Sequence, residues 1–264
     1  MLIVGERINS SRPAIKQAIE SKDSYFICLE AKAQTEAGAH YIDINTGTFI
    51  GQETHYLCWL VETVQGGTEL PLCIDSVNPE AVAAALEIVK RVPMINSITL
   101  EEKRMLGMIP LVKKYKTKIV ALCQSDAGIA NEVNDKIKIA EQIVQALTVE
   151  GIALDDIYID PLVYPIATDT RSALVTLKAI EEIKQSFPEV HTICGLSNVS
   201  FGLPARRFIN RAFLVAAMFS GLDSVILDPT DNEVMANLLA TSALLNRDEF
   251  CLTYINAYQD GKLF

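Results

Sequence analysis

The chain has 264 residues, of which 50% are hydrophobic and 21% are charged, a composition that excludes an intrinsically disordered chain. Lysine and arginine number 23 against 33 aspartates and glutamates, which gives a formal net charge of −10. A body with this charge repels a phosphate backbone, so we expect no nucleic-acid partner.

The hydrophobic segments predict neither export nor a membrane span. Charge follows the first few apolar residues already at Glu6 and Arg7, too early for a signal peptide. The apolar stretch from Ala212 to Leu222 has about half of the ~20 residues that a membrane-spanning helix needs. We therefore expect a cytoplasmic protein with no membrane partner.

The cysteines and histidines are scattered along the chain, and no two cysteines have the Cys-x-x-Cys spacing. Zinc sites need clustered thiolates or imidazoles, so we expect reduced cysteines and no protein-bound metal. The cysteines are Cys28, Cys58, Cys73, Cys123, Cys194 and Cys251, and the histidines are His40, His55 and His191.

Short β-branched runs alternate with longer amphipathic stretches, which is typical of parallel strands joined by crossover helices. Eight strands are expected, each followed by a helix, with one additional short helix after the first strand. In chain order the elements are strand Leu2–Ile8, helices Pro13–Ser21 and Ser24–Ala39, strand Tyr41–Asn45, helix Glu53–Gln65, strand Leu72–Val77, helix Pro79–Val89, strand Met94–Ile98, helix Glu101–Tyr115, strand Lys118–Cys123, helix Asn131–Glu150, strand Ile157–Leu162, helix Arg171–Phe187, strand Thr192–Leu196, helix Pro204–Phe219, strand Ser224–Leu227 and helix Asn232–Leu245.

This order predicts a closed (β/α)8 TIM barrel. We expect a single domain over residues 1–264, because such barrels routinely reach about 250 residues in one unit. Asn78 before Pro79 is a typical helix start, and Gly38, Gly151 and Gly221 stand where helices should end. A doubly wound open sheet is the alternative, but no Gly-x-Gly-x-x-Gly follows the first strand.

Almost every predicted strand ends in a carboxylate or an amide. The carboxyl ends of barrel strands face the ligand, so these side chains meet at one rim. Taken singly, each could instead bond loop amides or cap the next helix. Taken together, they favour ligand binding. They are Glu6 and Asn9, Asp43 and Asn45, Asp75, Asn96, Gln124 and Asp126, Asp160, Asn198 and Asp228.

Asp75, Asn96 and Asp160 are the strongest candidates, because each projects from a mostly apolar strand. Carboxylates and amides without a metal cluster or a Cys–His pair suit a neutral heterocycle with several N–H groups. An aminopyrimidinone is such a ligand, since one carboxylate can accept two parallel hydrogen bonds from its ring N–H and exocyclic amine.

The segment after the seventh predicted strand, Gly195–Pro204, is bounded by glycines and precedes Arg206 and Arg207. Glycine permits close approach of the backbone, and the arginines could meet an anionic tail. A tight turn with solvated arginines is the alternative. The spacing and the missing lysine argue against a phosphate-binding P-loop.

At this point the motifs resemble those of the methyltetrahydrofolate:corrinoid protein methyltransferases, a family of pterin-binding barrels. The resemblance extends from Leu2 to about Asp231 and is most specific in the segment Gly195–Pro204. It implies a (β/α)8 barrel, usually a homodimer. The matching motifs are Gly5–Asn9, Ile42–Asn45, Asp75-Ser76, Ile95–Ser97, Asp160-Pro161, Gly195–Pro204, Leu222-Asp223 and Asp228-Pro229.

The resemblance implies methyl transfer between N5 of (methyl)tetrahydrofolate and the cobalt of a cobamide. Because the cobalt is itself the nucleophile, no nucleophilic side chain is required, and catalysis must instead ease the departure of N5. Carried over by motif, Asp75, Asn96 and Asp160 anchor the pterin, and Asn198 hydrogen-bonds N5. Gly202 and Arg207 line the pterin and its tail. None of these residues is an evident proton donor, so we expect proton delivery through water, Asp75 and Asn198.

The sequence carries no Asp-x-His-x-x-Gly segment for cobalamin, so we expect the cobamide on a separate corrinoid protein that docks transiently at an open mouth. The direction of transfer cannot be read from residues. Dihydropteroate synthase is the alternative enzyme, but its loop motifs are absent from Asn9–Pro13 and Asp160–Pro165. A folate-binding subunit without turnover is the non-enzymatic alternative.

Overall fold

Eight parallel strands form the centre of the computed structural model, which describes residues 1–263. They are β1 (Leu2–Asn9), β2 (Tyr41–Asn45), β3 (Leu72–Asp75), β4 (Met94–Ile98), β5 (Lys118–Leu122), β8 (Ile157–Asp160), β9 (His191–Thr192) and β10 (Ser224–Leu227). Hydrogen bonds order them β10-β1-β2-β3-β4-β5-β8-β9. A bridge between Gly195 and Ile226 closes the ring, which confirms the predicted (β/α)8 TIM barrel.

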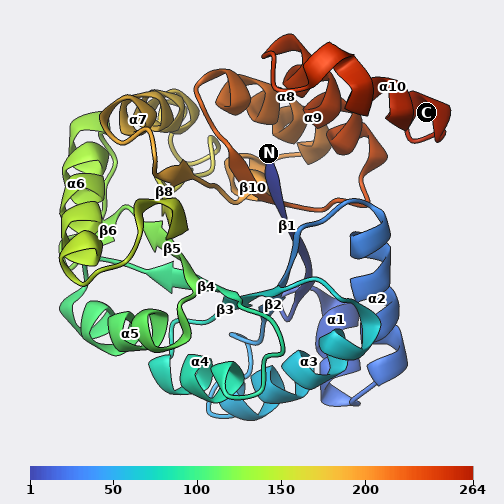
Figure 1. The fold of residues 1–264 in the computed structure, drawn as a ribbon, viewed down its shortest axis with the longest axis vertical. Helices are drawn as coiled ribbons and strands as arrows, with labels where there is room; N and C mark the ends of the chain where they lie inside the picture. Colours follow the sequence, from blue (N-terminus) through green and yellow to red (C-terminus); the bar gives the residue numbers. More distant parts are fainter. Residues whose placement is uncertain (264) are drawn as a thin grey trace.

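The helices form an outer layer around the strands (Figure 1). At the start of α4, Asn78 Oδ1 accepts from Glu80 N at 3.0 Å, as the Asn-Pro pair predicts. Gly38, Gly151 and Gly221 have positive φ just after helix ends. The helices are α1 (Pro13–Glu20), α2 (Ser24–Glu36), α3 (Glu53–Gly67), α4 (Pro79–Leu86), α5 (Glu102–Tyr115), α6 (Val133–Val149), α7 (Ser172–Ser186), α8 (Arg206–Phe219), α9 (Asn232–Leu244) and α10 (Leu252–Gln259).

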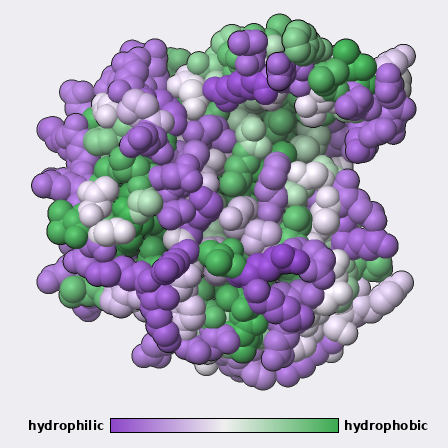
Figure 2. Space-filling model, in the orientation of Figure 1, coloured by the Kyte–Doolittle hydropathy of each residue, from purple (hydrophilic) through white to green (hydrophobic). Residues whose placement is uncertain are grey.

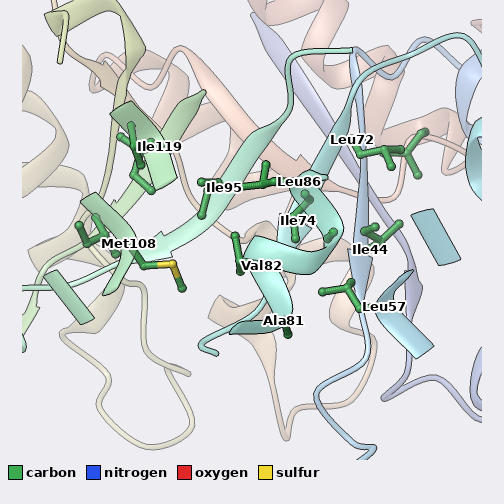
Figure 3. Packing of buried hydrophobic residues seen from close by; sticks show 14 of the residues in the cluster. Ile44, Leu57, Leu72, Ile74, Ala81, Val82, Leu86, Ile95, Met108 and Ile119 are labelled. Carbon is green, nitrogen blue, oxygen red and sulfur yellow. The ribbon is translucent and has the colours of Figure 1, made fainter. Parts of the chain in front are cut away.

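One set of strand side chains faces outward and packs on the helices. Figure 3 shows Ile74 and Ile95 among Leu57 of α3, Val82 of α4 and Met108 of α5. All five are fully buried. Burying a side chain of this size contributes about 1.5–3 kcal/mol, so this layer between sheet and helices supplies much of the driving force for folding.

The alternate set of strand side chains fills the barrel interior. Its buried members form a separate cluster contributed by strands and by Ile193, with no helix residue among them. Because side chains alternate across a strand, the residue two positions later points to the same side, nearer the carboxyl end. The interior therefore has an apolar layer and, two residues nearer the carboxyl ends of the strands, a polar layer. The pairs are Val4 and Glu6, Cys73 and Asp75, Met94 and Asn96, and Tyr158 and Asp160.

Some strands are shorter than predicted, for identifiable reasons. β8 ends at Asp160 because Pro161 has no N–H and Leu162 has a φ of 57°. The seventh strand, predicted over Thr192–Leu196, is regular only in β9. Ile193 N still donates to Ile159 O, but the chain then turns into a 3-10 helix, η2 (Leu196–Ser200).

Several short elements were not predicted. A short hairpin, β6 (Gln124–Ser125) with β7 (Gly128–Ile129), follows β5. After α9 come η3 (Glu249–Cys251) and α10, which packs against α9. Phe250 and Leu252 are exposed in this region, where Figure 2 shows hydrophobic side chains among hydrophilic ones. Across residues 1–263, no helix combines the length and apolar character that a bilayer crossing requires.

Candidate functional site

Asn45 and Asp75, the last residues of β2 and β3, lie side by side with Asn96 of β4. The strand register pairs Asn45 with Asp75 and Asp75 with Asn96. Nδ2 of Asn45 donates to Oδ2 of Asp75 at 2.9 Å. All three residues keep some exposed surface. The structure thus brings together two of the predicted site residues and adds Asn45, which orients the Asp75 carboxylate.

The Asp75 carboxyl titrates close to neutral pH. Burial raises its pKa to about 6, and the negative charge of Glu53 acts in the same direction. The hydrogen bond from Asn45 and the positive charge of Arg104 oppose this rise. A carboxyl with this pKa can exchange a proton near pH 6, which suits the proton delivery through Asp75 that the sequence analysis predicts.

Asp43 of β2 lies beneath this group and is 2% exposed. Its Oδ1 has no hydrogen-bond partner within the described chain. Burial raises the pKa of Asp43 well above its usual value, and the nearby Asp75 raises it further. A protonated Asp43 therefore avoids a second buried negative charge beside Asp75.

Asp160 stands at the end of β8, on the other side of the mouth, and is 5% exposed. Its Oδ1 accepts a hydrogen bond from Leu162 N at 2.7 Å. Burial raises the pKa of Asp160 to about 6, while the Leu162 hydrogen bond and the charge of Lys136 lower it. This carboxylate is held in one orientation by the turn that follows it.

Asn198 lies on η2 and is exposed. It borders a cavity of about 240 Å³ whose walls include Leu162, Tyr164 and Phe201. A Cβ added to Gly195 would come 3.0 Å from Asn198 Nδ2, so the backbone at Gly195 approaches the amide closely. The amide of Asn198 is thus positioned at the edge of an otherwise apolar cavity.

The segment that carries Asn198 is fastened on both sides. Ser197 Oγ donates to Glu6 Oε1 at 2.9 Å. Arg206 Nε donates to Ser200 Oγ at 3.0 Å, and its guanidinium also donates to the carbonyl of Ser197. Arg206 therefore holds this turn. Both acceptors lie in the loop that precedes α8, so in this structure Arg206 stabilises the turn, and a contact with an anionic tail stays a prediction.

Gly202 and Arg207 are both exposed. Gly202 has a φ of 82°, a conformation that explains glycine at this position. Arg207 is exposed at the start of α8, with its guanidinium carbon 5.0 Å from the centroid of the Phe208 ring. The structure does not bring Arg207 into contact with Asp75, Asn96 or Asp160.

Cysteines near the mouth do not supply a nucleophile. Cys73, Cys123 and Cys194 are fully buried. Burial raises the pKa of each thiol, to about 12 for Cys123, so these thiols stay protonated and inert at neutral pH. Within residues 1–263, no three His, Cys, Asp or Glu side chains gather as metal ligands. The mouth offers carboxylates and amides for recognition and proton transfer.

A second hollow lies away from this mouth. It is a groove of about 590 Å³ between α2, α9 and α10. Met1 and Ile3, at the amino end of β1, are among its lining residues. The ligand-binding end of a barrel is the opposite one, so we place the functional site at the carboxyl ends of the strands.

Lys136 is a buried cation near Asp160 that the sequence analysis does not identify. It lies in the first turn of α6 and is 2% exposed. A signal was present, since Lys136 occupies the same stripe as Ala140, Ile143 and Leu147, where an apolar residue is expected. A lysine in the core-facing stripe of a helix therefore predicts a buried cation with hydrogen-bond partners.

The model of the pterin-binding enzymes matches residues 5–228. The chain belongs to the pterin-binding enzyme family. It is 39% identical to a methylcorrinoid:tetrahydrofolate methyltransferase of Eubacterium limosum, over 100% of this chain and 98% of that protein. It is 33% identical to a methionine synthase of Mycobacterium tuberculosis, over 86% of this chain but only 20% of that protein. Family membership, predicted from the motifs, is confirmed.

Solved structures agree on the fold. A dihydropteroate synthase of Coxiella burnetii in complex with pteroic acid superposes with a TM-score of 0.66 at 16% identity, over 92% of this chain and 94% of that one. A dihydropteroate synthase of Xanthomonas albilineans gives 0.69 at 20% identity, over 94% and 92%. At these identities the likeness concerns the barrel and not the reaction.

Proposed function

We propose that this protein is a methyltransferase that moves a methyl group between N5 of tetrahydrofolate and the cobalt of a cobamide on a separate corrinoid protein. The observation that carries the proposal is full-length similarity, at 39% identity, to a methylcorrinoid:tetrahydrofolate methyltransferase. The polar mouth of the barrel supports it independently, because its carboxylates and amides match the hydrogen-bonding pattern of a pterin.

Asp75, Asn96 and Asp160 bind the pterin ring in this proposal. An ionised carboxylate accepts two parallel hydrogen bonds from a ring N–H and the exocyclic amine, while an asparagine amide both donates and accepts. The three groups project from β3, β4 and β8, so rigid strands hold them. Recognition by strand residues leaves the loops free to admit a second, larger reactant.

Asn198 acts at N5. Its amide can hydrogen-bond the nitrogen as the N5–carbon bond forms or breaks, and such a preorganised contact contributes most in the transition state. When N5 takes up the methyl group, its proton moves through water to Asp75; in the reverse direction a proton moves from Asp75 through water to N5. A pKa of about 6 suits both directions. The partner's cobamide supplies the cobalt centre that carries the methyl group, so this chain needs no nucleophile of its own.

The corrinoid protein docks at the mouth. Three large hydrophobic side chains in different loops around the mouth are exposed: Ile50 at 94%, Val77 at 61% and Phe201 at 65%. They follow β2, β3 and β9 in the chain, so all belong to loops at the carboxyl ends of strands. A dispersed apolar rim suits a transient partner.

Gly202 and Arg207 line the outer part of the folate site in this proposal. The protein works as a homodimer in the cytoplasm.

An assay of the purified protein with methylcobalamin and tetrahydrofolate tests the proposal. The methyl group starts on cobalt in this assay, because the relative is named a methylcorrinoid:tetrahydrofolate methyltransferase. We expect cob(I)alamin absorbance to appear together with methyltetrahydrofolate. Binding of tetrahydrofolate without this change would indicate a non-catalytic folate-binding subunit. Condensation of a pterin pyrophosphate with 4-aminobenzoate would indicate a dihydropteroate synthase instead.

A further inference from the structure

Lys136 is an unusual residue for the interior of a barrel protein. It is among the largest fully buried side chains, at 2% exposure, and its partners lie in the segments that directly follow β5 and β8. Burial of an ammonium group carries a large desolvation cost unless hydrogen bonds compensate it. The contacts that compensate Lys136 therefore indicate what the residue does.

The Lys136 ammonium donates to two consecutive carbonyls, those of Pro161 and Leu162, the latter at 2.9 Å. The same two residues form the turn directly after Asp160. Leu162 adopts a φ of 57°, which is unfavourable for a leucine, and its N–H donates to Asp160 Oδ1 at 2.7 Å. One side chain thus stabilises a strained turn whose amide orients the Asp160 carboxylate.

The turn leads into one wall of the cavity beside Asn198. Leu162, Val163, Tyr164 and Pro165 follow one another along this wall. A shift of the turn would therefore move the Asp160 carboxylate and the wall facing Asn198 together. Lys136 itself belongs to α6 and is not among the residues that line that cavity.

We propose that Lys136 is a positioning residue, which holds the Asp160–Pro161–Leu162 turn so that the Asp160 carboxylate faces the pterin. The inference rests on the proposed function, since it takes Asp160 as a pterin ligand. Lys136 does not touch the substrate in this scheme. It acts through the two carbonyls and through its charge on Asp160.

The positive charge of Lys136 predicts an effect on the pH dependence of pterin binding, which a purely structural role would leave unchanged. Lys136 is the charged group that lowers the pKa of Asp160. The titratable groups that face Asp160 from the neighbouring segments are the thiols of Cys123, directly after β5, and Cys194, after β9. Removal of the ammonium should raise the pKa of Asp160 above about 6. Pterin binding would then require a higher pH.

The test measures tetrahydrofolate affinity of the full-length protein against pH, with the variant Lys136→Met and the control Lys138→Met. Lys138 lies two residues along α6, and its side chain is 72% exposed. We expect Lys136→Met to weaken binding by at least about tenfold at pH 7 and to move the acid limb of the profile upward by about one unit. Lys138→Met should match the wild type.

A second comparison separates charge from packing. On an Asp160→Asn background, Lys136→Met should have little further effect on the pH profile, because the titrating group is gone. Lys136→Gln keeps an N–H donor and serves if the methionine variant does not fold. Equal loss of affinity at every pH, an unchanged profile, or failure of both variants to fold would overturn the inference. Failure of the wild type to bind tetrahydrofolate would overturn the proposed function as well.

Discussion

Gly195 and Asn198 are in such close contact that a single methyl group on Gly195 would lie 3.0 Å from Nδ2 of the asparagine. Gly195 has a φ of −74°, so the backbone itself does not require glycine. The reason for glycine is therefore space for the amide. The position of the Asn198 amide, which we propose acts at N5, therefore depends on the main chain at Gly195, where the barrel closes.

Gly195→Ala should displace the Asn198 amide by a few tenths of an ångström and slow methyl transfer. A misplaced group near the reacting atoms costs up to about 100-fold, so we expect a loss of kcat between about tenfold and that value. Tetrahydrofolate affinity should change little, because the strands that hold the ring are untouched. Gly66→Ala, where the added carbon meets only Cys28 Sγ at 3.9 Å, is the control. Equal kcat in both variants would contradict this reading.

Asn198→Ala removes the amide altogether. If the contact to N5 strengthens as charge develops, kcat should fall by about 100- to 1,000-fold, the usual effect of deleting one preorganised hydrogen-bond group. The dissociation constant of tetrahydrofolate should rise far less. Single-turnover kinetics and a binding titration measure the two effects. Asn134→Ala, at an exposed position on α6, is the matched control. Parallel losses in both quantities would show that Asn198 only binds.

Tetrahydrofolate affinity should fall as the pH drops below about 6. Burial raises the pKa of both Asp75 and Asp160 to about 6, so each must lose a proton below that pH before it can accept hydrogen bonds from the pterin. We expect up to about a tenfold loss per pH unit for each group that must ionise. Isothermal titration between pH 5 and 7.5 measures this, and a flat profile would show that the ring binds the protonated carboxyls.

The free energy of unfolding should depend on His191, at the far end of the barrel. Nε2 lies 2.9 Å from Asp155 Oδ1 and Nδ1 lies 3.2 Å from Asp223 Oδ2. The hydrogen bond with Asp223 and then that with Asp155 raise the pKa of His191 above the unfolded value of 6.5. The protonated ring therefore stabilises the fold fully below 6.5, and the effect is lost as the pH rises through the folded-state pKa.

Urea denaturation of the wild type and of His191→Gln at several pH values measures this contribution. The difference in unfolding free energy between the two proteins should shrink as the pH rises from about 6 to above 8, the direction that linkage requires for a raised histidine pKa. Methyl transfer should be unaffected, since His191 lies at the amino end of β9. Parallel stability curves would mean that His191 contributes no charge interaction.

The sequence identifies Asp75, Asn96 and Asp160 because strands have a simple period. Each follows an apolar residue by two positions, and the carboxyl ends of parallel strands share one edge. The motif around Asn198 is equally informative, because it indicates the family. By contrast, the sequence predicts that the seventh strand ends at Leu196, whereas the regular strand ends at Thr192. Hydrophobic pattern cannot show that a chain keeps its hydrogen bonds to both neighbours while leaving the regular ladder.

The sequence by itself determined the class of fold and most of the polar groups at its rim, since alternation, helical spacing and capping residues act over a few positions. Only the tertiary structure decided the partners: Asn45 on Asp75, Arg206 on its own loop, and Lys136 on the carbonyls after Asp160. It also decided which carboxyls titrate near pH 6. Desolvation and Coulomb interactions depend on distances between residues that are remote in the chain, and those distances exist only after the barrel has closed.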